Sequence, residues 1–262
     1  MVHQPAVEGL HLRIPAEAMR LLKIGASRGL TLRISGSLAV RMCCAENAQW
    51  LDILGRRPLR DIDYWGYSKE QGRLENLFEE QEYLADPTIK QAHEWGVKRL
   101  IYQHPHTHIK IDVFMDELVM AHTIEFKNRL ELVSSTVSVT DLILSKLQIH
   151  EITENDLIDL IVLFTEYGYD DNDRHGIDLG YITDILRRDW GFCYTALGNL
   201  EKCQEAVTRY PALPTELGAR ARQRLATMRE QIESAPKTSR WRLRSRIGTR
   251  ARWYEEVQEV DR

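Results

Sequence analysis

The chain has 262 residues, of which 43% are hydrophobic and 28% are charged, and its formal net charge is −4. These values are ordinary for a soluble globular protein with one large domain or two smaller ones. No apolar run approaches the ~20 residues that a membrane helix needs, and the N-terminal sequence lacks the pattern of a secretory signal. We therefore expect a cytoplasmic protein that does not associate with a membrane.

The four cysteines do not indicate a metal or disulfide scaffold. They form no C-x-x-C pair, so a zinc ribbon is not expected, and their number does not suggest a disulfide framework in a chain of this size. We expect small buried residues at all four positions, which are Cys43, Cys44, Cys193 and Cys203.

The first half of the chain alternates helical and extended patterns. An amphipathic helix is predicted over 15–29, with Pro15 near its start and Gly29 at its end. Alternating or β-branched segments predict strands, and amphipathic segments predict helices between them. The expected strands are 30–35, 61–67, 97–103, 108–115 and 123–132, and the expected helices are 38–48 and 69–84. This order predicts a mixed α/β (α+β) domain with a sheet flanked by helices.

The second half of the chain is predicted to be helical. Helical periodicity covers the segments 139–149, 154–167, 178–188, 190–209 and 215–234. We therefore expect an α/β domain over residues 1–137, a helical domain over 138–235, and a basic tail over 236–262.

The tail is strongly cationic. Residues 237–252 contain one Lys and six Arg and no acid, which indicates an anionic partner. With Trp241 and Trp253, the tail could bind RNA by phosphate contacts and base stacking. A solvated or disordered C-terminus is the alternative interpretation.

Asp61 and Asp63 are the first candidate metal ligands. Residues i and i+2 of a strand face the same side, so both carboxylates project together while Ile62 points into the core. The two charges repel, and a bound Mg²⁺ would relieve this repulsion while also contacting substrate phosphates. The alternative is a solvated strand edge.

Asp112 is a third candidate, because it interrupts the apolar strand 108–115. A lone acid in such a strand needs a metal or a cationic partner to offset its desolvation, and Lys110 or Arg99 could supply a salt bridge instead. If a neighbouring strand brings Asp112 beside Asp61 and Asp63, the three carboxylates can hold two metal ions that bridge a phosphate and an attacking hydroxyl.

Gly36 and Ser37 lie where a strand passes into a helix. Glycine allows a ligand to approach the backbone closely, and a helix N-terminus offers unpaired N–H groups to phosphate. The serine hydroxyl can donate as well.

Together, these residues resemble the nucleotidyltransferase superfamily, the polymerase-beta-like fold. The matching pattern is strand–Gly36-Ser37–helix, then Asp61-Ile62-Asp63 on the next strand, then Asp112 on a later one. More narrowly, the chain is similar to the AbiEii/MenT-like toxin branch, and the resemblance covers roughly residues 28 to 165. That branch has an Arg shortly before D-x-D, matched by Arg57 or Arg60. It also has a helix Lys, matched by Lys146, followed by a helix that Asn155–Asp159 matches.

The chain departs from the family pattern at three points. The gap between Ser37 and Asp61 is longer than in the minimal motif, and Leu59 stands where a hydroxyl residue is often found before D-x-D. The Arg common between the two helices of the toxin branch is missing, with His150 nearby. These departures affect nucleotide and acceptor choice.

The resemblance implies transfer of a nucleotide from an NTP to a hydroxyl acceptor, with release of pyrophosphate. Asp61 and Asp63 would bind Mg²⁺ (or Mn²⁺), and Asp112 would join them and help activate the acceptor. Gly36, Ser37, Arg57, Arg60 and Lys146 would contact the nucleotide; for Lys146 an exposed helix lysine is the alternative. The toxin branch implies RNA, such as a tRNA end, as acceptor and an antitoxin as partner. A non-catalytic nucleotide-binding or interaction module and an antibiotic nucleotidyltransferase are the rival functions.

Three further features have simple explanations. The alternate histidines of 104–108 could bind a metal, but a polar hairpin turn is the expected role. Asp170, Asp171 and Asp173 lack EF-hand spacing and are expected to form a solvated loop. The aromatic segment 189–194 is expected to pack the helical region against the core rather than to stack a nucleobase.

Overall fold

The computed structural model describes residues 9–87, 98–171, 173 and 175–256. The first residue of the predicted strand 97–103 and the last six residues of the predicted basic tail lie outside this set. Contacts divide the chain into two compact units. The α/β unit comprises residues 1–42, 58–118 and 125–137, and the helical unit comprises 43–57, 119–124 and 138–262. The helical unit therefore takes in two segments of the range 1–137, and the domain limits given above stay a prediction.

A five-stranded mixed sheet forms the centre of the α/β unit. Its strands are β1 (Leu32–Ser35), β2 (Asp61–Gly66), β5 (Lys110–Met115), β4 (Arg99–Gln103) and β3 (Leu84–Ala85), in that spatial order. β2 and β5 pair in parallel, and the other neighbours pair antiparallel. The mixed α/β fold predicted from the sequence is confirmed.

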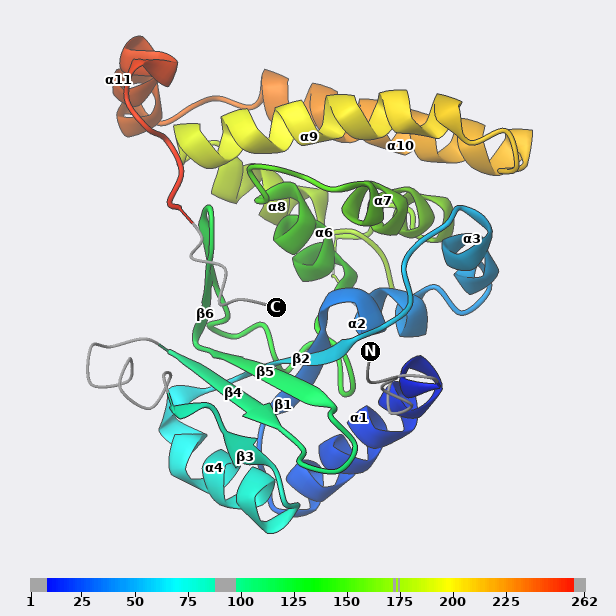
Figure 1. The fold of residues 1–262 in the computed structure, drawn as a ribbon. Helices are drawn as coiled ribbons and strands as arrows, with labels where there is room; N and C mark the ends of the chain where they lie inside the picture. The colour runs from blue at the N-terminus through cyan, green and yellow to red at the C-terminus, as the bar shows by residue number, and fades with distance from the viewer. Residues whose placement is uncertain (1–8, 88–97, 172, 174, 257–262) are drawn as a thin grey trace, which may run out of the picture. The chain divides into compact units, whose positions relative to one another are not determined.

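One face of this sheet lines the hydrophobic core of the unit. It packs against α1 (Leu10–Ser27) and α4 (Gln71–Glu80), which lie together on the same side of the sheet (Figure 1). Every second residue of β2 and β5 faces these helices and is buried, as the two-residue period of a strand requires. The Tyr64 hydroxyl donates a 2.8 Å hydrogen bond to the Ala18 carbonyl, and the Phe78 ring contacts the ring of Tyr64.

Several predicted element limits are wrong for identifiable reasons. The first helix begins at Leu10, so Pro15 lies inside it, where it removes a backbone donor. The predicted helix 38–48 divides into α2 (Gly36–Cys43) and α3 (Ala48–Ile53), because a turn joins Asn47 N–H to the Cys44 carbonyl at 3.0 Å.

The predicted strand 123–132 is mostly absent. Only β7 (Thr123–Glu125) is extended, and it pairs with β6 (Glu117–Val119) in a separate two-stranded sheet. The chain then turns, with Asn128 at a φ of 60°, and the Phe126 ring stacks on Trp65 at 3.9 Å. This aromatic contact takes the place of further strand pairing.

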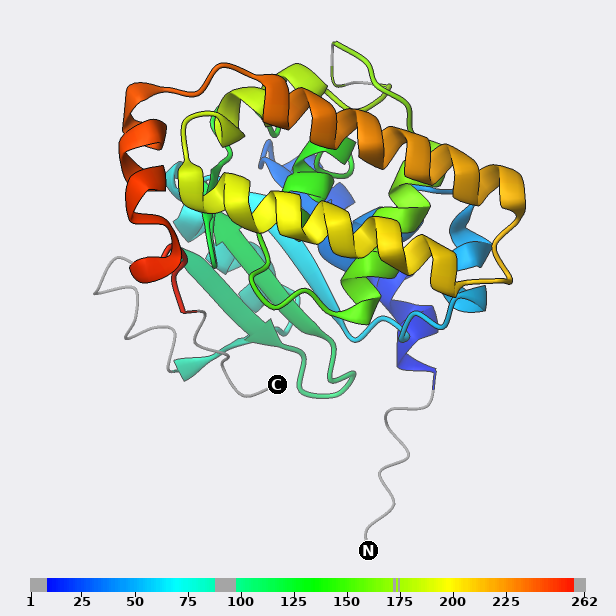
Figure 2. The same cartoon turned by 90° about the horizontal axis from the view of Figure 1, so that it is seen from above.

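The helical unit contains α3, α6 (Val139–Leu147), α7 (Glu154–Glu166), α8 (Leu179–Leu186), α9 (Trp190–Arg209) and α10 (Thr215–Ser234). The long helices α9 and α10 lie side by side (Figure 2). Thr153 and Asp156 form a capping box at the start of α7, which fixes where that helix begins. Among the described residues, we find no helix with the length and apolarity to cross a membrane.

The described part of the C-terminal segment, up to residue 256, has defined secondary structure and is largely exposed. It forms α11 (Ser239–Ile247) and the 3-10 turn η2 (Gly248–Arg250), followed by an extended end. The Arg244 guanidinium lies 4.7 Å from the Trp190 ring, and Trp253 Nε1 donates to Thr195 Oγ1 at 3.1 Å. These contacts fasten the tail to α9 of the same unit.

Candidate functional site: a carboxylate face of the sheet

The second face of the sheet carries the three predicted carboxylates. Ile62 and Ile111 point to the core face, so Asp61, Asp63 and Asp112 all lie on the opposite face. Asp63 and Asp112 are register partners on the parallel strands β2 and β5, which places their Cα atoms about 4.8 Å apart. All three residues are half-buried. The structure therefore places the three acids on one face of two adjacent strands.

Asp112 is held by an arginine from β4. Arg99 Nε lies 3.1 Å from Asp112 Oδ1 and Arg99 Nη2 lies 2.9 Å from Oδ2, so the contact is bidentate. The guanidinium also lies 5.0 Å from the Phe114 ring centroid. The side chains of Arg99 and Asp112 are 23% and 16% exposed. The salt-bridge alternative with Arg99 is therefore present in the structure.

Gly36 is pressed against Asp63. Its φ is +61°, and a Cβ at this position would lie 2.1 Å from Asp63 Oδ2 and 3.0 Å from Asp63 Cγ. Both features require glycine, because a side chain would be strained in this conformation and would collide with the carboxylate. Gly36 and Ser37 begin α2, so the N-terminus of this helix lies beside the carboxylate face.

The donors suit a hard divalent cation, although they are not assembled into a metal centre. Asp61 forms no ion pair with another residue that the structure describes, and carboxylate oxygens are the ligands that Mg²⁺ prefers. Within the described ranges, no group of three His, Cys, Asp or Glu side chains is close enough to hold a metal ion. Asp61 and Asp63 thus fit a metal, whereas Arg99 has to leave Asp112 before that carboxylate can join them.

Lys146 lies in a buried ionic cluster of the helical unit. Its Nζ is 2.7 Å from Asp156 Oδ1 and 2.9 Å from Asp159 Oδ2. Asp159 is fully buried and also accepts from Arg56, with Nε 2.7 Å from Oδ1. Burial pushes the pKa of Lys146 down, but the carboxylates of Asp159 and Asp156 outweigh it and raise the pKa overall. The exposed-lysine alternative is therefore wrong, and the predicted phosphate contact stays a prediction.

The two candidate arginines before β2 are exposed. Arg57 belongs to the helical unit, where its backbone N–H donates to Asn155 Oδ1 at 3.0 Å. Arg60 belongs to the α/β unit and directly precedes Asp61. The role of Arg56 was not predicted, because nothing in the Arg56-Arg57 pair shows which arginine turns toward a buried acid.

The histidine turn and the acidic loop show no metal geometry among the residues described. His104 Nδ1 accepts from the backbone N–H groups of His106 and Thr107 at 3.2 and 3.3 Å, so it organises a polar turn. Asp170, Asp171 and Asp173 lie in a loop interrupted by two residues outside the described set. Of the four cysteines, all free, three are buried as expected and Cys43 is half-buried.

The aromatic segment packs on the tail. Trp190 stacks on Tyr194 at 5.2 Å, and the Trp253 ring lies 5.1 Å from Tyr194. Packing is expected here, and the described partners lie in the same unit: the C-terminal segment, and His122, whose ring stacks on Phe192 at 5.0 Å. Trp253 is consequently engaged within the protein, and so is Trp241, whose ring receives the Lys237 ammonium at 5.6 Å.

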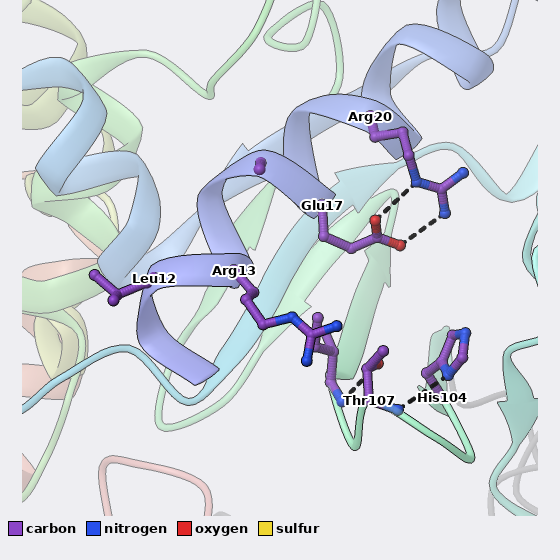
Figure 3. A pocket seen from close by; sticks show the side chains of 8 residues that line it. Leu12, Arg13, Glu17, Arg20, His104 and Thr107 are labelled. Carbon is purple, nitrogen blue, oxygen red and sulfur yellow. Dashed lines mark hydrogen bonds and ion pairs between the residues drawn. The ribbon is translucent and has the colours of Figure 1, made fainter. Parts of the chain in front are cut away.

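A surface cavity of about 450 Å³ lies elsewhere on the α/β unit (Figure 3). It is formed by α1 and by the turn between β4 and β5, and Arg13, Glu17 and His104 are among its lining residues. Glu17 is paired with Arg20, whose hydrogen bond is the main cause of the lowered pKa of this carboxyl. None of the predicted site residues lines this cavity.

No family model and no curated protein matches the chain. Among solved structures, the chain is similar to the lincomycin-bound crystal structure of the lincosamide antibiotic adenylyltransferase LnuA. The two share 16% sequence identity, the match covers 55% of this chain and 92% of that chain, and the TM-score is 0.38. A similarity at this level assigns no family, so the geometry of the sheet face has to carry any functional proposal.

Proposed function

We propose that this chain is a metal-dependent nucleotidyltransferase that moves a nucleoside monophosphate from an NTP to a hydroxyl acceptor. The observation that carries the proposal is the carboxylate face, where Asp61, Asp63 and Asp112 share one side of two parallel strands and Gly36 abuts Asp63. Like charges placed together cost stability unless a cation compensates them, as Arg99 does for Asp112. The resemblance to the nucleotidyltransferase superfamily supports the same interpretation.

In this mechanism each residue has a defined task. Asp61 and Asp63 hold Mg²⁺ (or Mn²⁺), which supplies charge neutralisation to the phosphates when bound. The first N–H groups of α2 and the Ser37 hydroxyl bind phosphate oxygens. Asp112, once released by Arg99, accepts the proton of the acceptor hydroxyl. A bond then forms from that oxygen to the α-phosphorus, and the bond to pyrophosphate breaks. We include Arg60, which belongs to the same unit as the three carboxylates, as a proposed phosphate contact.

RNA is the acceptor that we propose, in a toxin-like role in the cytoplasm with an antitoxin as partner. The toxin-branch resemblance supports this choice, and the tail adds a physical reason. Four arginines of α11 and η2 are exposed and form no ion pair with another described residue; they are Arg240, Arg242, Arg246 and Arg250. Because Trp241 and Trp253 are engaged internally, the tail would bind RNA through phosphates, without base stacking.

Calorimetry of each NTP with and without MgCl₂ tests the activity's first step. We expect Mg²⁺-dependent binding in the wild type and its loss in Asp63→Ala, because this residue holds the metal. Asp171→Ala, which removes an exposed loop acid, is the matched control and should bind like the wild type. Equal binding by wild type and Asp63→Ala would exclude the proposed site.

Titration of a fluorescent single-stranded RNA tests the acceptor. Removing one arginine–phosphate contact lowers the slope of log affinity against log salt by about 0.7, so Arg242→Ala/Arg246→Ala should flatten the slope by about 1.4. Arg222→Ala changes an exposed arginine of α10 and serves as control. The same slope in both variants would argue against RNA on the tail.

A non-catalytic module is the second candidate, and the Arg99–Asp112 pair favours it. An arginine fixed on the third carboxylate would block both metal ligation and proton acceptance by Asp112. NTP binding without pyrophosphate release, tested with RNA and with small hydroxyl-bearing acceptors, would support this function over transfer.

A further inference from the structure

We propose that Arg99 is a positioning residue that holds the carboxylate face closed to metal until a nucleotide arrives, and that it then exchanges Asp112 for the nucleotide phosphates. This inference rests on the proposed function, because it concerns the same sheet face. Arg99 thus contacts Asp112 in the nucleotide-free protein and the phosphates in the nucleotide-bound protein.

Arg99 is a cation on this face that contacts one of its three carboxylates, Asp112. Arg33, on the same face of β1, donates instead to the backbone carbonyls of Val133 and Leu32 at 2.5 and 2.8 Å. Lys110, on the same face of β5, is exposed and forms no ion pair with another described residue. Arg99 alone of these three reaches an acid, and it covers both oxygens of Asp112.

The geometry of this pair makes it exchangeable. A bidentate guanidinium–carboxylate contact is among the stronger ion pairs, so Asp112 is well compensated without metal. Both side chains are nevertheless partly exposed, and water can therefore replace the contacts when the pair opens. By contrast, the Arg56–Asp159 pair is 8% and 0% exposed and has no such freedom.

Phe114 gives the released guanidinium a second point of support. The Arg99 guanidinium already lies 5.0 Å from this ring, and a cation can keep an aromatic contact while its hydrogen-bond partner changes. The forked donors of arginine match phosphate oxygens as well as carboxylate oxygens. Arg99 can thus move from Asp112 to a phosphate on the same face without leaving the sheet.

If Arg99 makes this exchange, replacing it should change the affinity for metal alone and the affinity for the metal–nucleotide complex in opposite directions. Metal alone has to compete with Arg99 for Asp112, so Arg99→Gln should bind metal more tightly, by about tenfold. The metal–nucleotide complex gains Arg99 as a phosphate ligand, so the same variant should bind this complex about tenfold more weakly. A purely structural arginine would weaken both.

Electron paramagnetic resonance of free Mn²⁺ measures both affinities directly. MnCl₂ is titrated into wild type, Arg99→Gln and Lys110→Gln, first alone and then with a non-hydrolysable NTP analogue. Lys110→Gln removes one positive charge from the same face and reports the general electrostatic effect. Opposite shifts in Arg99→Gln, beyond those of Lys110→Gln, are expected; shifts of one sign, or shifts equal to the control, would overturn the inference.

Two further measurements keep the result interpretable. Arg99→Lys retains the charge but loses the fork, so if Arg99→Gln fails to fold, Arg99→Lys should still show tighter Mn²⁺ and weaker Mn²⁺–nucleotide binding. Asp63→Ala tests the proposed function separately. If the wild type does not bind Mn²⁺, or if Asp63→Ala binds it as well as the wild type does, the proposed metal site is excluded. Wild-type binding that Asp63→Ala abolishes, with no opposite shifts at Arg99, overturns only the role of Arg99.

Discussion

Replacing Gly36 by alanine should disable the carboxylate face while leaving the protein folded. The added Cβ would lie 2.1 Å from Asp63 Oδ2, whereas ordinary van der Waals contact begins at 3.4 Å. The Asp63 carboxylate is the flexible partner in this collision, so it should rotate away rather than unfold the sheet. The metal would thereby lose one of its two best-placed ligands.

Gly36→Ala is expected to have two separate effects, one on the unfolding free energy and one on nucleotide binding. A non-glycine residue with positive φ costs roughly 1–2 kcal/mol, and Gly36 has a φ of +61°. Displacing a ligand by about 1 Å can cost on the order of 100-fold in binding or rate. We therefore expect a modest loss of unfolding free energy together with a large loss of metal-dependent nucleotide binding.

Gly55→Ala separates these two effects. Gly55 has a φ of +85°, but nothing lies within 4 Å of where its Cβ would be, so this variant carries the backbone strain alone. Both variants are compared by urea unfolding and by calorimetric titration of Mg²⁺–NTP. If Gly36→Ala binds nucleotide as well as Gly55→Ala, Gly36 does not position Asp63 for a ligand and the reasoning fails.

Three further predictions concern the helical unit. Asp159→Ala leaves Lys146 and Arg56 without their shared buried acid and should cost about 3–5 kcal/mol in urea unfolding; a loss below about 1 kcal/mol would contradict the cluster. Burial lowers the pKa of His122 to about 4, so the unfolded state binds its proton more tightly. The unfolding free energy is then fully retained above about pH 6.5 and should fall by up to about 3 kcal/mol between about pH 6.5 and 4, a decline that His122→Gln should flatten. Trp253→Ala should release the tail, and trypsin should then cut within 240–252 before any other site, whereas unchanged cleavage would show that other contacts hold it.

Much of the fold could be predicted because hydrophobic periodicity reflects burial directly. The strands at 61–66 and 110–115 and the helices of the second half follow it closely. The errors come from contacts between segments distant in sequence. The stacking of Phe126 on Trp65 ended the predicted strand 123–132, and the packing of Trp253 on α9 ordered a tail whose composition alone favours solvent.

The candidate site could be predicted in its composition but not in its pairing. Alternation places Asp61 and Asp63 on one face without any structure, and the apolar neighbours of Asp112 show that it needs a partner. Which partner it takes depends on strand order, because β4 lies beside β5 and brings Arg99 onto the same face. For the same reason, the burial of Lys146 between two acids was not evident from its helix alone.

Charge compensation separates the acids that stabilise this protein from those available to a ligand. Asp159 is fully buried and has two cationic partners, whereas Asp61 is half-buried and has no described ion-pair partner. Like charges on one face repel, so an Asp61 without an ion-pair partner should destabilise the metal-free protein. Asp61→Asn should therefore raise the unfolding free energy without metal, by up to about 1 kcal/mol, while it weakens Mn²⁺ binding. Asp171→Asn, in an exposed loop, should change neither quantity. If Asp61→Asn is less stable than the wild type in EDTA, Asp61 stabilises the metal-free protein. It would then not be a metal ligand of the kind proposed.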